Sequence, residues 1–199
     1  MVMKRWYVGL GVMLLVIGAI AARFSRTSLS TYYRLKYYVH DVPKHPALGA
    51  VAGMIKHNPF FNQRHALLVD MSLPSSANRM SLYDLSHRTV LFQTRVMHGA
   101  KSGKVIPTQF SNRLGSNKTA LGRYVIVGTY KGHFGLAYRL TGLDNSNSNA
   151  LARSIVLHRS AYVRANRISR SEGCPAVSSA ALAHMKPFLK EGTLVWLYQ

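Results

Sequence analysis

The sequence is poor in cysteine and in acidic side chains, and both shortages limit the chemistry open to it. Cys174 is the only cysteine among 199 residues, so no disulfide can form within the chain. Glycoside hydrolysis by paired carboxylates and two-metal catalysis have few residues to draw on. The six acidic residues are Asp41, Asp70, Asp84, Asp144, Glu172 and Glu191.

Several catalytic motifs are also missing. The sequence has no H-E-x-x-H segment and no cysteine pair, which argues against a zinc peptidase. It has no G-x-S-x-G elbow, which argues against a serine hydrolase of the α/β type. The lone thiol of Cys174 is therefore either a reactive group or an inert residue of the core.

Positive charge, in contrast, is abundant. Lysine and arginine number 26 and give a formal net charge of +20. Such a field attracts nucleic acid, anionic lipid or an acidic cell-wall polymer, and charge alone does not choose among them. Apolar residues make up 48% of the chain, which is enough for a folded core. The length fits one domain with an additional segment.

The N-terminus carries the longest apolar run, from Trp6 to Ala22, and no charge interrupts it. This run predicts a membrane-spanning anchor or a signal peptide over residues 1–22. Trp6 and Tyr7 are typical of a membrane interface and favour an uncleaved anchor. The small residues at 19–21 offer a cleavage site to the alternative, a signal peptide.

The charges on either side of this run favour the opposite orientation from export. The positive-inside rule places the more basic flank in the cytoplasm, and here the more basic flank is the C-terminal one. The flanking cations are Lys4 and Arg5 before the run, and Arg23, Arg26, Arg34 and Lys36 after it.

Residues 23–64 are basic and mixed, and they predict a membrane-proximal linker with short helical pieces, one of them over 47–58. Tyrosines interleaved with cations in this linker could stack on bases. Packing beside the membrane anchor is the simpler account, so we expect no nucleic-acid partner.

From residue 65 onward the apolar residues alternate, which predicts a mainly β domain over 65–199, a sandwich or a barrel. A helix is expected at 178–190 with Ser178 or Ser179 as its N-cap. Two long polar loops, 100–122 and 142–152, are interpreted as facing a substrate. The expected strands are 66–71, 80–85, 89–99, 123–130, 136–143, 154–158 and 193–198.

A cysteine nucleophile needs a base and backbone donors for an oxyanion. Gly173 allows a sharp turn before Cys174, and Ser171 can add a hydroxyl hydrogen bond. His158 ends an expected strand 16 positions before Cys174, and the intervening loop can bring the two together. His98 and His184 are weaker candidates for the base.

The pattern of His158 followed by Ser171-Glu172-Gly173-Cys174 resembles the L,D-transpeptidase (YkuD-like) catalytic domain family, in its murein L,D-transpeptidase branch. Separate blocks from residue 66 to residue 198 resemble that branch in order, among them FSNRLGS, LGRYVIVGTY and IVLHRSAYV. The resemblance implies a YkuD-like β-sandwich fold for the catalytic domain.

The resemblance also implies a mechanism. Cys174, activated by His158, would attack a peptidoglycan tetrapeptide stem, with backbone N–H groups of Gly173 and Cys174 holding the oxyanion. An amine of a second stem would then take the acyl group and form a 3-3 crosslink. No metal and no organic cofactor would be needed, and the domain would work in the cell envelope, in the periplasm or cell wall.

Four residues are candidate substrate contacts: His98, Arg159, Glu172 and Tyr162. Glu172 before Gly-Cys and Arg159 after the histidine both depart from the usual family pattern. Two alternatives stay open. One is an L,D-carboxypeptidase or amide hydrolase on the same scaffold. The other is a non-catalytic basic module that binds cell-wall polymer or nucleic acid.

Overall fold

A computed structural model of the chain describes residues 46–56, 58–164 and 168–199. The predicted N-terminal segment 1–22 and most of the predicted linker lie outside this part, and the predicted domain boundaries stay predictions. Among the described residues, the helices are all too short or too polar to cross a membrane.

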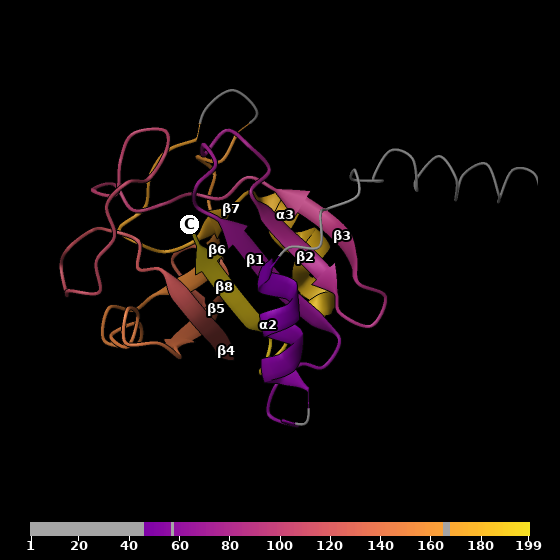
Figure 1. The fold of residues 1–199 in the computed structure, drawn as a ribbon. Helices are drawn as coiled ribbons and strands as arrows, with labels where there is room; N and C mark the ends of the chain where they lie inside the picture. The colour runs from indigo at the N-terminus through magenta and orange to yellow at the C-terminus, as the bar shows by residue number, and fades with distance from the viewer. Residues whose placement is uncertain (1–45, 57, 165–167) are drawn as a thin grey trace, which may run out of the picture. The chain divides into compact units, whose positions relative to one another are not determined.

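Eight strands form one continuous sheet in the order β3-β2-β1-β8-β4-β5-β6-β7 (Figure 1). Neighbouring strands are antiparallel except for β1 with β8 and β6 with β7, which are parallel. The strands are β1 His65–Asp70, β2 Met80–Asp84, β3 Thr89–Thr94, β4 Gly122–Gly132, β5 Gly135–Gly142, β6 Val156–Arg159, β7 Ala176–Val177 and β8 Leu194–Tyr198.

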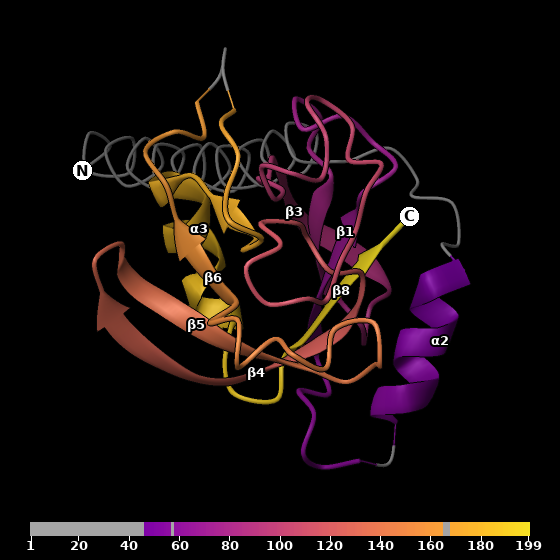
Figure 2. The same ribbon diagram turned by 90° about the vertical axis from the view of Figure 1, so that its left-hand side faces the viewer.

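The mainly β prediction is confirmed, but the two packed sheets of a sandwich are not observed. The last strand, β8, pairs with β1 on one side and with β4 on the other. The strand β8 therefore joins the antiparallel strands β1, β2 and β3 to the strands β4, β5 and β6 in a single curled sheet (Figure 2). Alternation within a strand cannot reveal this, because it says which face is buried and not which strand lies alongside.

The seven strands predicted from the sequence are all present, with shifted ends. Predicted strand 89–99 stops at Thr94, because the chain then leaves β2 and runs to the segment around Cys174. There Met97 N–H donates to the carbonyl of Ala176 at 2.8 Å. The prediction missed β7, whose two residues are too few to show alternation.

The helix α3 (Ser179–Met185) fills the concave side of the sheet (Figure 2). Ser178 caps it as predicted, by accepting a hydrogen bond from the N–H of Ala181 at 3.2 Å. The helix is shorter than the predicted 178–190, because Pro187 cannot donate an N–H, and a 3₁₀ turn (η1, Lys186–Phe188) follows.

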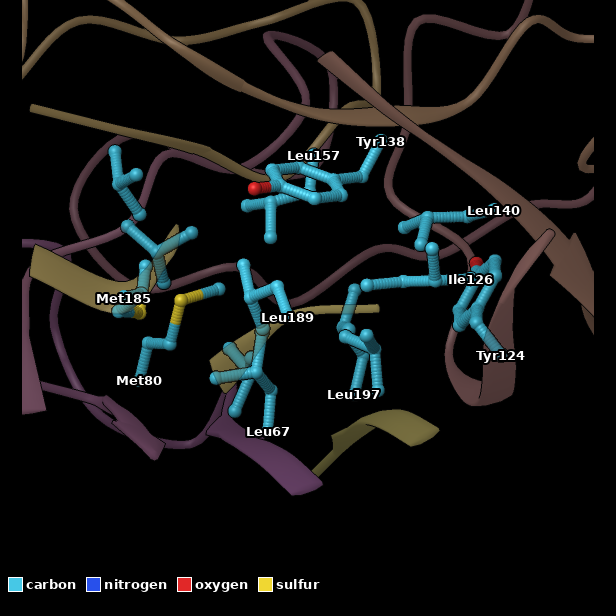
Figure 3. Packing of buried hydrophobic residues seen from close by; sticks show 14 of the residues in the cluster. Leu67, Met80, Tyr124, Ile126, Tyr138, Leu140, Leu157, Met185, Leu189 and Leu197 are labelled. Carbon is cyan, nitrogen blue, oxygen red and sulfur yellow. The ribbon is translucent and has the colours of Figure 1, made fainter. Parts of the chain in front are cut away.

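The core lies between α3 and the curled sheet. Buried side chains from seven strands and from the α3 region converge there, including Leu67, Met80, Ile126, Tyr138, Leu157, Met185 and Leu197 (Figure 3). A second helix, α2 (Pro46–Ile55), buries Val51 and Ile55 and overlaps the predicted helix 47–58.

Replacing Met185 by alanine should destabilise the fold by about 2–5 kcal/mol, because a fully buried side chain is removed from the centre of the core. The free energy of unfolding in urea measures this. The exposed neighbour Lys186 is the control, and Lys186→Ala should change stability by less than about 0.5 kcal/mol. Equal losses in the two variants would mean that α3 is not the centre of the core.

Candidate active site

The parallel pairing of β6 with β7 brings His158 and Cys174 into one site. His158 lies opposite Ala176 in this register, and Cys174 precedes Ala176 by two residues. The short segment from Cys174 to Ala176 therefore runs up to the strand end that carries His158. His158 and Cys174 both line a cleft of about 410 Å³.

The residues that line this cleft come from four loops and from the strands β4 and β6. They are Leu114, Gly115, Asn117, Tyr130, Phe134, Ala152, Arg153, Ser154, Val156, His158, Glu172 and Cys174.

Ser171 organises the turn that carries Cys174. Its hydroxyl donates to the carbonyl of Cys174 at 2.6 Å and accepts from the N–H of Gly173 at 3.1 Å. Its own N–H donates to the carbonyl of His98 at 2.9 Å, which ties the turn to the segment after β3. The Gly173 N–H, predicted as an oxyanion donor, is therefore bonded to Ser171 in this structure.

Gly173 is required by the backbone at this turn. Its φ of +125° is a conformation that side chains disfavour, and a Cβ would lie 2.8 Å from the carbonyl oxygen of Lys118. The same Cβ would lie 2.9 Å from Nη2 of Arg153. The turn can therefore pack against the 100–122 loop only with glycine at this position.

The imidazole of His158 is held in one tautomer by a backbone carbonyl. Its Nδ1 lies 2.9 Å from the carbonyl oxygen of Arg159, and a carbonyl can only accept. Nδ1 therefore carries the proton, and Nε2 keeps a lone pair. Burial lowers the pKa of His158, opposed by the bond to the Arg159 carbonyl, and only 6% of the residue is exposed.

The surroundings of Cys174 favour its neutral thiol form. Burial raises its pKa, and the charge of Glu172 adds to this, while the N–H of Val156 and the charge of Arg153 oppose it. The Sγ lies 3.7 Å from the carbonyl oxygen of Ser154, to which the thiol donates. The opposite shifts of the thiol and the imidazole favour a neutral pair over a thiolate–imidazolium pair.

The predicted substrate contacts are placed in different ways. Glu172 lines the cleft beside Cys174, whereas Tyr162 is 66% exposed on the loop after β6 and does not line the cleft. The side chain of Arg159 also lies outside the cleft lining and donates through Nε to the carbonyl of Phe134 at 2.8 Å.

His98 is buried away from the cleft and is only 1% exposed. Nη2 of Arg79 donates to its Nδ1 at 2.9 Å, and its Nε2 donates to the carbonyl of Gly103 at 3.1 Å. Its ring therefore supports the loop beneath the turn of Cys174. The other histidine considered, His184, stacks on Phe92 with ring centroids 4.3 Å apart.

The sequence did not point to Arg153, Tyr130 or Phe134 as cleft residues. Arg153 joins two loop carbonyls, donating to Ser111 at 2.7 Å and to Lys118 at 2.5 Å. No motif identifies such a residue, because its partners are backbone atoms. The loop 100–122, in contrast, was predicted to face a substrate and does contribute to the cleft lining.

A second hollow of about 240 Å³ adjoins the cleft. It shares Tyr130, Ser154 and Val156 with the cleft and adds Leu151, Ile155 and Arg139. The guanidinium carbon of Arg139 lies 4.7 Å from the centroid of the Tyr130 ring. Within the described residues, no group of three or more histidine, cysteine or acidic side chains could hold a metal.

The sequence model of the L,D-transpeptidase catalytic domain family matches residues 45–198, which is most of the chain. The chain belongs to this family. No curated protein matches it.

Solved structures with a similar arrangement include L,D-transpeptidase 3 of Mycobacterium tuberculosis, with 10% identity and a TM-score of 0.45 over 68% of this chain and 61% of that one. An L,D-transpeptidase of Mycobacterium smegmatis has 11% identity and a TM-score of 0.44 over 68% and 59%. A mutant L,D-transpeptidase of Enterococcus faecium has 13% identity and a TM-score of 0.44 over 71% and 52%. The match thus spans only about half to three fifths of these chains, and the family assignment rests on the family model.

Gly173→Ala should cost about 1–3 kcal/mol of stability, because the new Cβ meets the Lys118 carbonyl and Arg153 at a strained φ. Gly115→Ala is the matched control, since its φ of +66° is also positive but a Cβ there meets open space. The Gly115→Ala variant should lose roughly 1 kcal/mol in its free energy of unfolding. Urea unfolding compares the two, and a Gly173 variant as stable as the Gly115 variant would contradict the packing described.

The rate at which iodoacetamide alkylates Cys174 should rise only at a pH above the ordinary thiol range, because burial raises the pKa of this thiol. Glu172→Gln removes a negative charge that also raises the pKa, so its inflection should move to lower pH. Mass spectrometry of the alkylated chain against pH gives both profiles. An inflection near or below neutral pH in the unmodified sequence would instead indicate a thiolate–imidazolium pair.

Proposed function

We propose that this protein is a cysteine-dependent L,D-transpeptidase that acts on peptidoglycan tetrapeptide stems through an acyl-enzyme. The observation that carries the proposal is that His158 and Cys174 line one cleft, next to the paired strands β6 and β7. Family membership makes stem peptides the expected substrate class. In this proposal Cys174 is the nucleophile, His158 is the base, and Ser171 and Gly173 shape the turn.

The acylation step starts from the neutral pair. As Nε2 of His158 takes the thiol proton, Sγ of Cys174 bonds to the carbonyl carbon of the third stem residue. The bond from that carbon to the nitrogen of D-alanine breaks, and the imidazolium returns the proton to the leaving amine. Because the Gly173 N–H is bonded to Ser171, we assign the oxyanion chiefly to the N–H of Cys174.

The second step transfers the acyl group. A neutral amine of another stem bonds to the thioester carbon and gives its proton to His158, and the carbon–sulfur bond breaks. The thiolate regains its proton from the imidazolium. Two adjoining hollows that share Tyr130, Ser154 and Val156 offer room for two stems, which supports transfer to a second stem over hydrolysis. A carboxypeptidase would use water in place of the amine.

The location follows from the substrate. Peptidoglycan lies outside the cytoplasmic membrane, so we propose that the domain works in the cell envelope. The apolar run at residues 6–22 would serve as its anchor or export signal. Protease accessibility of the domain in intact cells tests this against the orientation favoured by the flanking charges.

Exposure of the full-length protein in detergent to a carbapenem should add the mass of one drug molecule. The reason is that a nucleophilic Cys174 would attack the lactam carbonyl in the same way as the carbonyl of a stem peptide. Cys174→Ala should add none, and His158→Gln should slow acylation by about 10²–10⁴-fold. Intact-mass spectrometry measures all three. In parallel, tetrapeptide muropeptides with and without an amine acceptor distinguish crosslinking from hydrolysis by their products.

Two outcomes would overturn the proposal. Conversion of tetrapeptides by Cys174→Ala would show that another residue is the nucleophile. A complete lack of adduct and of conversion, together with salt-sensitive binding to an anionic polymer, would instead indicate a non-catalytic basic module.

A further inference from the structure

The tip of the β4–β5 hairpin covers the imidazole of His158. The ring of Phe134 lies against it with centroids 4.4 Å apart and planes inclined at 30°. Phe134 also lines the cleft and is 48% exposed, so its ring forms part of the lip beside the proposed base. The position of this ring therefore affects both the orientation and the hydration of His158.

The tip itself has little support from the sheet. Gly132 and Gly135 form the last pair of the β4–β5 ladder, which leaves His133 and Phe134 beyond it. The hydrogen bond from Nε of Arg159 to the carbonyl of Phe134, at 2.8 Å, ties this turn to β6.

Gly135 makes room for that guanidinium. Its φ is +78°, and a Cβ there would lie 3.0 Å from Nε of Arg159. The β5–β6 register, with Ala137 opposite His158, places Arg159 beside the start of β5, within reach of the tip. Glycine at 135 and arginine at 159 thus fit each other.

We propose that Arg159 is a positioning residue for His158 that acts through Phe134. Residue 159 then holds the imidazole at two points: its carbonyl binds Nδ1, and its side chain keeps the Phe134 ring against the imidazole face. This inference rests on the proposed function, in which His158 is the base. It replaces the expectation that Arg159 contacts the substrate.

The charged and titratable side chains around His158 must be considered in any test. They are Arg159 on its own strand, Cys174 and Glu172 on the nucleophile turn, Arg153 and Tyr130 in the cleft, and His133 next to Phe134 on the hairpin. Lys131 lies on the same hairpin, in β4. A suitable control therefore removes one positive charge nearby and keeps the bond to Phe134. Lys131→Met does this on the same hairpin.

The test compares Arg159→Met, Phe134→Ala, the double variant and Lys131→Met, each in the full-length protein in detergent. Arg159→Met should lower the acylation rate about 10–100-fold with KM for a tetrapeptide donor changed less than twofold, because the base is misplaced and not the substrate. If Arg159 acts through Phe134, the double variant should be no slower than Phe134→Ala alone. Arg159→Lys keeps one donor and should recover part of the rate.

A second readout does not depend on any substrate. NMR titration of the His158 ring, assigned by its loss in His158→Gln, should show a higher pKa in Arg159→Met, because water reaches the imidazole and burial no longer lowers its pKa as far. The acid limb of kcat/KM should move to higher pH in the same variant. Lys131→Met should leave both unchanged.

The two proposals can fail separately. If the unmodified protein converts no stem peptide but the His158 titration still shifts in Arg159→Met, the transpeptidase assignment fails and the placement of His158 by Arg159 stands. If stems are converted, additive losses in the double variant, an unmoved titration, or an equal effect of Lys131→Met would each overturn the role of Arg159.

Discussion

Only two residue pairs form the ladder between β6 and β7, and the geometry of the site depends on this ladder. His158 pairs with Ala176 and Arg159 with Val177, which sets where the preceding turn can place Cys174. So short a strand cannot hold its register alone. The turn before it is held by Ser171, whose backbone bonds to the segment after β3 and whose hydroxyl closes on Cys174. Register and turn together bring Cys174 and His158 to the same cleft.

The shortage of acids explains how these loops are tied together. The structure records ion pairs at Asp84 and Asp144, while many guanidinium groups donate instead to backbone carbonyls. Most of these bonds join segments that lie far apart in the sequence, without a buried carboxylate. Examples are Arg79 with Val96, Arg95 with Ser76, Arg153 with Ser111 and Lys118, and Arg159 with Phe134.

The sequence predicted what depends on local pattern. Alternation located the seven longer strands, Ser178 marked the start of α3, and the spacing of His158 and Cys174 selected the two residues that line the cleft together. It could not predict the joining of two sheet halves through β8, since strand partners far apart in the chain leave no local signal.

Two of the predicted substrate contacts have backbone partners in the structure, which the sequence did not indicate for a related reason. His98 and Arg159 are polar residues at strand ends near the nucleophile, and a substrate contact was a fair expectation for both. Their partners are carbonyls of Gly103 and Phe134, and any residue type supplies a carbonyl. A sequence shows which side chains can donate, but only the fold shows which backbone acceptor lies within reach.

The use of a carbonyl in place of a carboxylate also sets the protonation of the site. A carboxylate behind an imidazole stabilises the imidazolium and so favours transfer of the thiol proton before substrate binds. The Arg159 carbonyl fixes the same tautomer of His158 but stabilises the imidazolium less than a carboxylate would. Burial disfavours a charge on His158 and on Cys174. In the proposed reaction, the thiol therefore remains neutral and loses its proton only as a bond to the substrate carbon forms.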